Sequence, residues 1–534
     1  MRLGIDLGTT HTVVALADRG NYPVLPFTDE NGDAHEFWPS VAALRGVGPG
    51  TVAVDGDEDT APPELVFGFD AVAAQRQGAP GLRSFKRLLG DPGATGDTVV
   101  ELAGFPVTLL DLTTGYLSAL REEIAAQLAD ALDPEEPLEV VVSVPAHAHT
   151  AQRFLTLEAF ARAGFVVVAM INEPSAAGME FTHRQTRALS SRRTQVLVYD
   201  LGGGTFDASL VEAEGDQHEV VGSVGVNRLG GDDFDSALAQ TVLDAVARED
   251  GAQPHLTRAQ WRRLVEACRS AKEGLTPQTR RLVVELGDRD VVVSVEEFYV
   301  RAAELVESSV EAMEPLVGRL DTGSISASLS AVAGMYLVGG ASGLPLVARV
   351  LRERFGRRVH RSPYPGAATA IGLAIAADPD SRYTLRDRLS RALGVFREWD
   401  SGRALAVDEV IPADTELPSG EPVTVTRRYR PVHDLGVLRY VEYHRVDDAG
   451  QPVGELVPVA EVRFPFTREL QDVVRADGGA LAGLAGREPR HLGDDEHAGL
   501  VEEAYTLWPD GRVELTIADL ETGYEFTTAP TRRA

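Results

Sequence analysis

Two aspartates in this chain, Asp6 and Asp200, each stand shortly before a turn built from small residues. The turns consist of Gly8, Thr9 and Thr10 in the first case and of Gly202, Gly203, Gly204 and Thr205 in the second. Small side chains let an anion approach the backbone N–H groups of such a turn. An aspartate beside a phosphate would repel it unless a divalent cation lay between them, so each turn predicts a phosphate site with magnesium.

The two turns belong to one repeated pattern. LGIDLGTTHTVVAL at residues 3–16 is echoed by LVYDLGGGTFDASLV at residues 197–211, and each copy predicts a strand, a turn and a second strand. A single glycine-rich turn is weak support for a nucleotide site, because glycines also mark ordinary β-turns. Two matching turns, each led by an aspartate, favour two related lobes that present the same hairpin.

A third glycine turn, at Gly339 and Gly340, separates a strand-like run from a helix that begins near Pro345. Backbone donors at a helix N-terminus suit the α-phosphate or the ribose of a nucleotide. Taken alone, this segment fits a tight strand-to-helix turn better than a ligand site.

Strand-like and helical patterns alternate from the N-terminus to about Asp378, which is typical of an α/β domain. From about Leu393 short strand-like segments dominate instead, and they predict a β-sandwich-like domain. We therefore expect a nucleotide-binding domain over residues 1–377, a linker over 378–390 and a β domain over 391–534.

The charge balance excludes several classes of partner. The chain carries 51 basic and 81 acidic residues, and its net charge of -30 repels phosphate backbones and argues against general nucleic-acid binding. No apolar run reaches the roughly 20 residues that a membrane helix needs. The first residues enter a strand pattern at once and leave no room for a secretory leader. Together with a single cysteine, Cys268, these features predict a cytoplasmic protein without nucleic-acid or membrane partners.

Lysine is almost absent from the chain. Among the 51 basic residues only Lys86 and Lys272 are lysines, and the others are arginines. Lysine is a compact point charge and arginine a planar fork, so a surviving lysine marks a place where the fork does not fit. The alternative is that two lysines survived by chance.

Five further segments carry a resemblance to the heat-shock protein 70 family, in that family's order and at about its spacing. They are SFKRLLG at 84–90, VVVSVPAHAHTAQR at 140–153, INEPSAAG at 171–178, LGGDDFD at 229–235 and LVGGASGLP at 337–345. The resemblance covers about the first 380 residues. It implies an α/β fold, a two-lobed actin-like ATPase domain with duplicated ribonuclease H-like lobes, followed by a β-rich sandwich-like domain. It also implies ATP and ADP as ligands, with Mg²⁺ and K⁺ as cations.

The resemblance implies a catalytic role for several residues. Lys86 matches the lysine that contacts the γ-phosphate and orients the attacking water, which explains why a point charge survives there. Glu173 matches the glutamate that helps to place water and metal. Asp6 and Asp200 match metal-facing carboxylates, so magnesium is expected beside Asp6, Asp200 and Glu173, largely through water.

Other residues gain a role beside the phosphates. Thr9 and Thr205 match hydroxyls near the γ-phosphate, and Asp207 matches the acid that follows them. Asp207 also fits a residue that caps a turn, and this alternative stays open. Pro145 and Arg153 match the pair that, in the family, relays the nucleotide state towards the linker.

The adenosine side resembles the family less closely. The nucleotide-binding positions that the resemblance adds are Gly230, Gly231, Arg269, Lys272, Glu273, Thr276, Gly339, Gly340, Ala341 and Ser342. Arg269 stands where the family has glutamate, and Glu273 stands where it has the arginine that stacks on adenine. These two lie at i and i+4, so the exchanged charges can still pair along one helix face. Gly343 and Gly366 replace a family arginine and a family aspartate, and we expect ATP to bind with weaker base selectivity.

Two histidines, His147 and His149, flank a predicted strand end. With no cysteine or carboxylate at ligand spacing, we expect them to be surface residues rather than metal ligands. No Gly-x-Ser-x-Gly nucleophile motif occurs either.

The C-terminal part resembles the same family only loosely. TLRDRLSRALGVF at 384–396 and VIPADTELP at 410–418 resemble the opening of the family's substrate-binding β-sandwich. The family's hydrophobic linker is replaced by a charged segment at 381–387, and no helical pattern long enough for an α-helical lid follows. A sandwich that docks one fixed partner is the alternative to a peptide-binding domain.

The leading hypothesis is a lidless chaperone of this family, in which slow Mg²⁺-dependent ATP hydrolysis is coupled to the β domain. Its implied partners are an unfolded or specific client polypeptide, a J-domain cochaperone and a nucleotide exchange factor. A low-turnover, nucleotide-gated scaffold or regulatory protein that recognises one partner is the second hypothesis. A sugar kinase of the same superfamily is less favoured, because no sugar-binding acid stands out.

Overall fold

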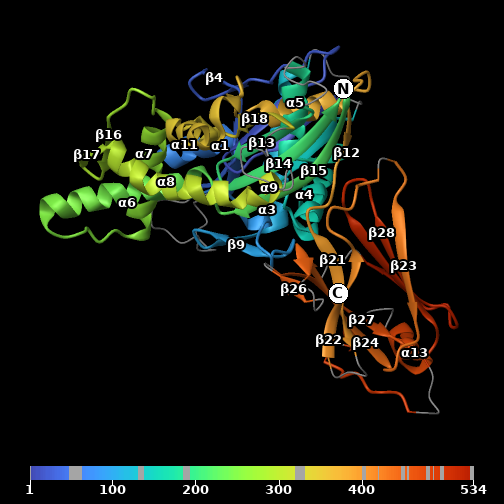
Figure 1. Ribbon diagram of the computed structural model, residues 1–534. Helices are drawn as coiled ribbons and strands as arrows, with labels where there is room; N and C mark the ends of the chain where they lie inside the picture. The colour runs from blue at the N-terminus through green and yellow to red at the C-terminus, as the bar shows by residue number, and fades with distance from the viewer. Residues whose placement is uncertain are drawn as a thin grey trace.

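The computed structural model describes residues 2–46, 63–129, 137–184, 193–318, 331–399, 404–418, 420–446, 451–453, 456–476, 481–484, 486–493 and 498–528. Two α/β lobes and a β domain make up this part of the chain, and the β domain lies at the opposite end of the molecule from α6 and α7 (Figure 1). Among the helices of these ranges, none combines the length and the apolar character that crossing a membrane requires.

The first lobe is built on a five-stranded sheet with the order β12-β11-β1-β2-β5. Its strands are β1 (Arg2–Leu7), β2 (His11–Leu16), β5 (Trp38–Pro39), β11 (Glu139–Val144) and β12 (Val166–Asn172). Strands β1 and β2 form a hairpin, whereas β11 and then β12 are added in parallel beside β1. Helices α3 (Leu109–Gln127) and α4 (Thr150–Arg162) share one apolar core with this sheet.

Smaller elements complete the first lobe. They are β3 (Phe27–Thr28), β4 (Ala34–His35), β6 (Val41–Arg45), β7 (Glu64–Phe67), α1 (Gly68–Arg76), β8 (Gly81–Arg83), α2 (Lys86–Leu89), β9 (Val99–Leu102) and β10 (Phe105–Thr108). The short helix α2 contacts both α3 and α4, so it is fixed on the lobe that carries β1.

The second lobe repeats this topology. Its sheet has the order β19-β18-β13-β14-β15-β20, with β13 (Gln195–Leu201), β14 (Thr205–Glu214), β15 (Gln217–Asn227), β18 (Val332–Val338), β19 (Val359–Arg361) and β20 (Thr384–Arg386). Strands β13 and β14 form the hairpin, and β18 and then β19 are added in parallel beside β13. The duplication predicted from the two sequence copies is therefore confirmed in the strand order.

Helices and a separate hairpin cover the second sheet. They are α6 (Gly231–Asp250), α7 (Arg258–Glu273), β16 (Arg281–Leu286), β17 (Arg289–Ser294), α8 (Val295–Ala312), α9 (Glu314–Gly318), the 3₁₀ turns η1 (Gly340–Gly343) and η2 (Gly356–Arg358), and α11 (Pro345–Phe355). Leu238, Phe298 and Leu337 belong to the shared apolar core of these elements.

Two helices, α5 (Glu173–Arg184) and α12 (Ala368–Ala377), pack against each other between the two sheets. Glycines permit the close approach: a Cβ atom on Gly372 would lie 1.8 Å from the carbonyl oxygen of Ala176, and one on Gly4 would lie 2.3 Å from the amide nitrogen of Ala374. These contacts hold the inner faces of both lobes at a fixed spacing.

The β domain consists of two four-stranded antiparallel sheets. Their orders are β22-β21-β24-β27 and β23-β28-β29-β30. The strands are β21 (Ala392–Trp399), β22 (Ala404–Ile411), β23 (Val423–Tyr429), β24 (Leu435–Tyr443), β27 (Val457–Pro465), β28 (Val501–Leu507), β29 (Val513–Asp519) and β30 (Glu525–Thr528), with β25 (Arg445–Val446) and β26 (Pro452–Val453) as a short side hairpin. Val395, Phe464 and Leu515 belong to the core between the sheets, as in a β-sandwich. Helix α13 (Arg468–Ala476) and the 3₁₀ turn η3 (Leu481–Leu484) pack beside them.

The segment expected to be a linker has regular structure of its own. Strand β20 pairs in parallel with β15, with Thr384 opposite Gln217. Asp387, which follows β20, is buried and accepts hydrogen bonds from the backbone and the side chain of Asn172. The charged segment is thus tied to both lobes rather than solvated along its length.

The contact between α5 and α12 yields a stability prediction. We expect Gly372→Ala to cost about 1–3 kcal/mol of unfolding free energy, because the new methyl group meets a backbone carbonyl that cannot rotate away. The urea midpoint measures the loss. Gly93→Ala is the matched control, since a Cβ atom there has no neighbour within 4 Å; equal midpoints for both variants would contradict the predicted contact.

Candidate active site

The two glycine turns of the repeated hairpins face each other across the lobes. A Cβ atom on Gly203 would lie 2.5 Å from Cγ2 of Thr10, and one on Gly204 would lie 2.6 Å from Cγ2 of Thr9. Only glycine fits at these two positions, because any larger residue would push the threonines of the opposite lobe away. The structure therefore brings the two predicted phosphate turns into one site.

Four carboxyl groups lie around these turns, three of them buried and the fourth, Asp6, partly buried. Asp6 and Asp200 lie near the ends of β1 and β13, Asp207 lies near the start of β14, and Glu173 opens α5. The only lysine beside them is Lys86, whose Nζ donates to Oε1 of Glu173 at 2.5 Å. Both side chains of this ion pair are less than a tenth exposed, at 8% and 9%.

The carboxylates act on one another electrostatically. Burial first, and then the carboxylates of Glu173 and Asp207, raise the pKa of Asp200 well above its ordinary value. Burial raises the pKa of Glu173 to about 7, although the ammonium group of Lys86 opposes the shift. Burial would lower the pKa of Lys86, but the carboxylates of Glu173 and Asp6 outweigh it and the net direction is upward. Lys86 therefore stays charged inside the site.

This donor set fits a magnesium ion. Burial and mutual repulsion raise the pKa values of Asp6, Asp200 and Glu173, so these groups ionise together more readily when a hard divalent cation, bound through oxygen ligands, supplies further positive charge beside Lys86. No three acidic, histidine or cysteine side chains in the described ranges converge closely enough to hold a metal ion by themselves. The arrangement therefore suits a cation that keeps much of its water shell, as magnesium does.

A small chamber adjoins the ammonium group of Lys86. Its volume is about 20 Å³, and Thr9, Thr205, Pro145 and Asn227 are among the residues that line it. A polar chamber of this size holds one water molecule. The site thus has room for a nucleophile next to the lysine predicted to orient it.

The third glycine turn meets the same site. Gly339 has a positive φ of 81°, and a Cβ atom on it would lie 2.4 Å from Oδ1 of Asp200. Gly340, Ala341 and Ser342 continue as η1, where Ser342 donates to the Gly339 carbonyl at 2.7 Å. The backbone of this turn therefore approaches the carboxylate directly, which a tight turn by itself would not require.

The start of α6 continues the second phosphate turn. The amide of Gly231 donates to the carbonyl of Gly202 at 2.9 Å, and a Cβ atom on Gly230 would lie 2.6 Å from the amide nitrogen of Gly204. Lys272 on α7 donates to the Gly231 carbonyl at 2.8 Å. The second surviving lysine therefore binds a backbone oxygen in a crowded place, where the guanidinium fork of arginine would need more room.

The helix spacing allows Arg269 to pair with Glu273, but the structure gives Arg269 other partners. Arg269 instead forms ion pairs with Asp232 at 2.7 Å and with Asp235 at 3.1 Å, both on α6. Helix α7 packs against α6, so the face that carries Arg269 points at the acidic start of α6, whereas Glu273 is exposed. Glu273 and Thr276 mark the end of α7 and the turn after it.

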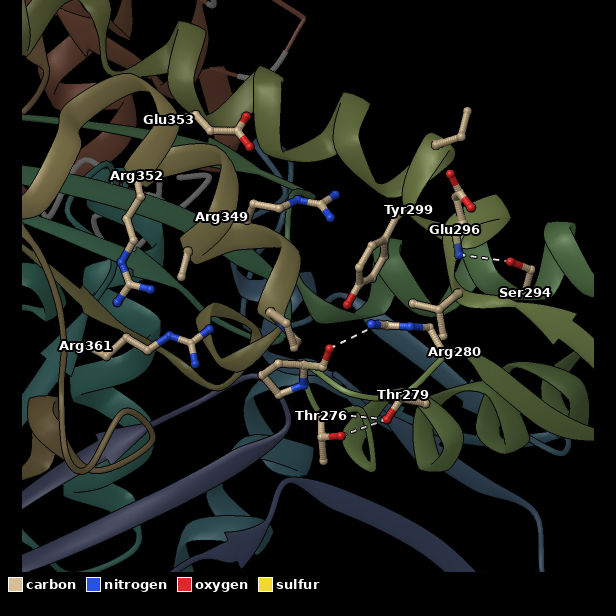
Figure 2. A pocket seen from close by; sticks show the side chains of 15 residues that line it. Thr276, Thr279, Arg280, Ser294, Glu296, Tyr299, Arg349, Arg352, Glu353 and Arg361 are labelled. Carbon is tan, nitrogen blue, oxygen red and sulfur yellow. Dashed lines mark hydrogen bonds between the residues drawn. The ribbon is translucent and has the colours of Figure 1, made fainter.

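A large hollow that the sequence did not suggest borders Thr276. It has a volume of about 1120 Å³ and lies between α8, α11 and the turn after α7 (Figure 2). The arginines that point into it are Arg280, Arg349, Arg352 and Arg361 (Figure 2). Arg349 stacks over the ring of Tyr299 at 5.3 Å. One signal in the sequence could have indicated this hollow: Arg349 and Arg352 are three residues apart in a predicted helix, so they lie on the same helix face.

The surface positions expected for His147 and His149 are also wrong. Their exposed fractions are 3% and 2%. His147 contacts Oδ1 of Asp207, and His149 accepts the amide of Gln152 as the N-cap of α4. The sequence placed them after a strand, where solvent is the usual surrounding, but the β domain and the second lobe cover this loop.

The loop after β11 reaches the β domain. The amide of Thr150 donates to Glu442 of β24 at 3.1 Å. Arg153 is buried and donates to Oδ1 of Asn172 at 2.6 Å, while Asn172 in turn donates to Asp387 at 2.7 Å. Pro145 lines the chamber beside Lys86. Of the two positions matched to a relay, Pro145 thus lies at the predicted phosphate site, and Arg153 reaches the segment before the β domain through Asn172.

Comparison with known proteins agrees with this geometry. The model of the Hsp70 protein family matches residues 94–416. The chaperone protein DnaK of Thermotoga neapolitana is 30% identical over 543 aligned residues, which cover 99% of this chain and 80% of that protein. The chaperone protein HscA of Klebsiella pneumoniae is 31% identical over 440 residues, or 78% of this chain, and the alignment spans 64% of HscA. The chain therefore belongs to the Hsp70 family of ATP-dependent chaperones, and its two lobes are those of an actin-like ATPase domain.

Proposed function

We propose that this chain hydrolyses ATP between its two lobes and transmits the nucleotide state to its β domain, which binds a polypeptide. The observation that carries the proposal is the buried pair of Lys86 and Glu173 beside Asp6 and Asp200. This set lies where two glycine turns from opposite lobes meet. We also propose that the nucleotide-binding domain ends at residue 377 and that a linker over 378–390 precedes the β domain, because the sandwich core begins at Leu393.

The proposed site assigns a task to each group. The amides of the turns at Gly8 and Gly203 bind phosphate oxygens, because only glycine lets the backbone come so close. Lys86 attracts the charge that develops on the γ-phosphoryl group and orients a water molecule in the adjoining chamber. Attack of that water on the γ-phosphorus breaks the bond to the bridging oxygen and releases ADP and phosphate. Glu173, held by Lys86, accepts a hydrogen bond from the water.

Cations complete the charge balance of the site. A bound Mg²⁺ ion would neutralise phosphate charge, and Asp6, Asp200 and Glu173 would hold it largely through water. We propose K⁺ as a further cation, because the carboxylates outnumber the ammonium group of Lys86.

We propose that the adenosine end of the site discriminates only weakly between nucleotide bases. Its wall consists of Gly230, Gly231, Lys272 and the turn at residues 339–342. Arg269 forms ion pairs with Asp232 and Asp235 of α6. An arginine so engaged is not free to contact a base. This supports binding that depends chiefly on the phosphates.

The β domain is proposed to take a client without a helical cover. Among the described residues after 391, the only α-helix is α13, of 9 residues, and it packs against β27. Exchange of a bound peptide is therefore expected to be fast. A J-domain cochaperone and a nucleotide exchange factor are the proposed partners. The cytoplasm is the proposed location, in keeping with a single, unpaired thiol at Cys268.

Substitution of Lys86 tests hydrolysis. We expect Lys86→Ala to lower the single-turnover rate of ATP hydrolysis about 100-fold or more, because the charge beside the γ-phosphate is lost, while ATP binding persists. Lys86→Arg keeps the charge but places a fork in a site that is 8% exposed, so we expect it not to restore the rate. Unchanged client protection by Lys86→Ala would favour the nucleotide-gated scaffold instead.

Substitution of Asp200 tests the magnesium site. With ligand at about 100 times its Kd, Mg²⁺ and ATP together should stabilise the chain by about 2.7 kcal/mol, and we expect Asp200→Asn to lose most of the part that depends on Mg²⁺. Thermal unfolding with ATP, in Mg²⁺ or in a chelator, measures this part. The exposed Asp97→Asn serves as the control. An equal dependence on Mg²⁺ in both variants would exclude Asp200 from the metal site.

Hydrogen exchange tests the coupling between domains. Amides of β20, β21 and β24 should differ in protection between ATP and ADP, because Asp387 and Glu442 bond to residues of the first lobe. The strand β29, which pairs only within its own sheet, is the internal control. Identical protection in both nucleotides would remove the coupling from the proposal while leaving hydrolysis untouched.

A further inference from the structure

The arginine-lined hollow of the second lobe takes no part in the proposed reaction. It lies between α8, α11 and the turn after α7, and its volume is about 1120 Å³ (Figure 2). Cavities that bury a drug-sized ligand typically measure about 300–1,000 Å³. The hollow therefore has room for a small molecule, and the chemistry of its lining decides which one it suits.

Four arginines from three segments of the chain converge on this hollow (Figure 2). They are Arg280 in the turn after α7, Arg349 and Arg352 on α11, and Arg361 on β19. Two carboxylates, those of Glu296 and Glu353, also line it. The lining is thus more cationic than anionic, in a chain whose net charge is -30. This reversal of the overall charge indicates an anionic ligand.

Neutral groups hold three of these arginines in place. The guanidinium group of Arg349 lies over the ring of Tyr299, at 5.3 Å from its centroid. Arg361 donates to two backbone carbonyls, those of residues 343 and 344, each at 3.4 Å. Arg280 donates at 3.3 Å to the backbone carbonyl three residues before it. Rings and carbonyls orient a guanidinium group without cancelling its charge.

The charge of these arginines is not balanced by ion pairs. Within the described part of the chain, none of the four forms an ion pair with a carboxylate, whereas Arg354 on the same helix pairs with Glu307. Burial first, and then the charge of Arg352, lowers the pKa of Arg361. Two cations thus repel each other across the hollow, and an anion bound between them would relieve this repulsion.

Phosphate groups suit this arrangement better than carboxylates do. A guanidinium group presents paired donors in one plane and matches the oxygens of either anion. A phosphate group is tetrahedral and carries three strong acceptor oxygens, so it accepts donors that arrive from several directions. The arginines reach the hollow from three different segments, and four of them can contact more than one phosphate group.

We propose that this hollow is a second anion site, which binds a small molecule that carries two or more phosphate groups. Of the positions predicted to contact the nucleotide, only Thr276 is among the residues that line it. The hollow is therefore distinct from the predicted triphosphate site beside Lys86. A ligand in it would bridge the turn after α7 to α11 and β19. The proposal does not depend on hydrolysis of ATP by this chain.

Calorimetric titration of the full chain with inorganic tripolyphosphate tests the site. A non-hydrolysable ATP analogue and excess Mg²⁺ are kept saturating, so that the predicted phosphate turns are already filled. We expect about one tripolyphosphate to bind per chain, with an affinity that falls as salt is added, because exposed charges are screened. Absence of binding at low salt would overturn the proposal.

Substitutions locate the bound anion. We expect Arg349→Gln and Arg361→Gln each to weaken the binding of tripolyphosphate about tenfold, because each removes a charge-assisted hydrogen bond. The matched control is Arg354→Gln, which removes the same charge from the same helix but outside the hollow. All three side chains are exposed, and equal melting temperatures would show that the variants fold. Equal affinities in Arg349→Gln and Arg354→Gln, or a loss caused by Lys86→Ala instead, would place the anion elsewhere and overturn the proposal.

Two further probes distinguish the source of the phosphate groups. Adenosine 3′,5′-bisphosphate joins them to a base, and hexaglutamate offers carboxylates alone. Tighter binding of the bisphosphate than of tripolyphosphate, lost in Arg349→Gln, would assign the site to nucleotides, and the reverse order would assign it to inorganic polyphosphate. Hexaglutamate that binds as tightly as either phosphate probe would overturn the proposal in favour of an acidic polypeptide. A chain that binds no ATP analogue would refute the proposed function, yet the arginine substitutions would still decide the role of the hollow.

Discussion

The gathering of four carboxyl groups, three of them buried, around one ammonium group is the constraint on which the rest of this molecule depends. Asp6 and Glu173 come from the first lobe and the start of α5, while Asp200 and Asp207 come from the second lobe. Their mutual repulsion opposes closure of the lobes, and Lys86 offsets only part of it. A site of this kind closes more firmly when cations enter with the nucleotide, which gives a physical reason for coupling ligand to lobe position.

Glycines allow the two lobes to make close contacts at the site. The turns at Gly203 and Gly204 pack against threonines of the other lobe at distances that exclude any side chain, and Gly372 does the same between α5 and α12. Such close contacts restrict how the two lobes can be placed relative to each other, because a shift of a few tenths of an ångström breaks them. The two turns therefore fit together closely in the arrangement that the structure shows.

Buried polar hydrogen bonds fasten the β domain and the segment before it to the first lobe. Glu442 binds the start of α4, and Asp387 binds Asn172 at the end of β12. Buried charges of this kind need their partners in place, so they are lost together when the lobes move. This is the property that the proposed coupling between the lobes and the β domain requires.

The sequence alone determined the repeated hairpins, the family and the order of the domains, because these depend on local patterns: an aspartate before small residues, and strands that alternate with helices. It also singled out Lys86 and Lys272, since lysine is so rare here. Only the tertiary structure decided the partners of Arg269 and the burial of His147, because both depend on which surface packs against them. Spacing along a helix shows which residues share a face, but the charge that they meet belongs to a segment distant in the chain.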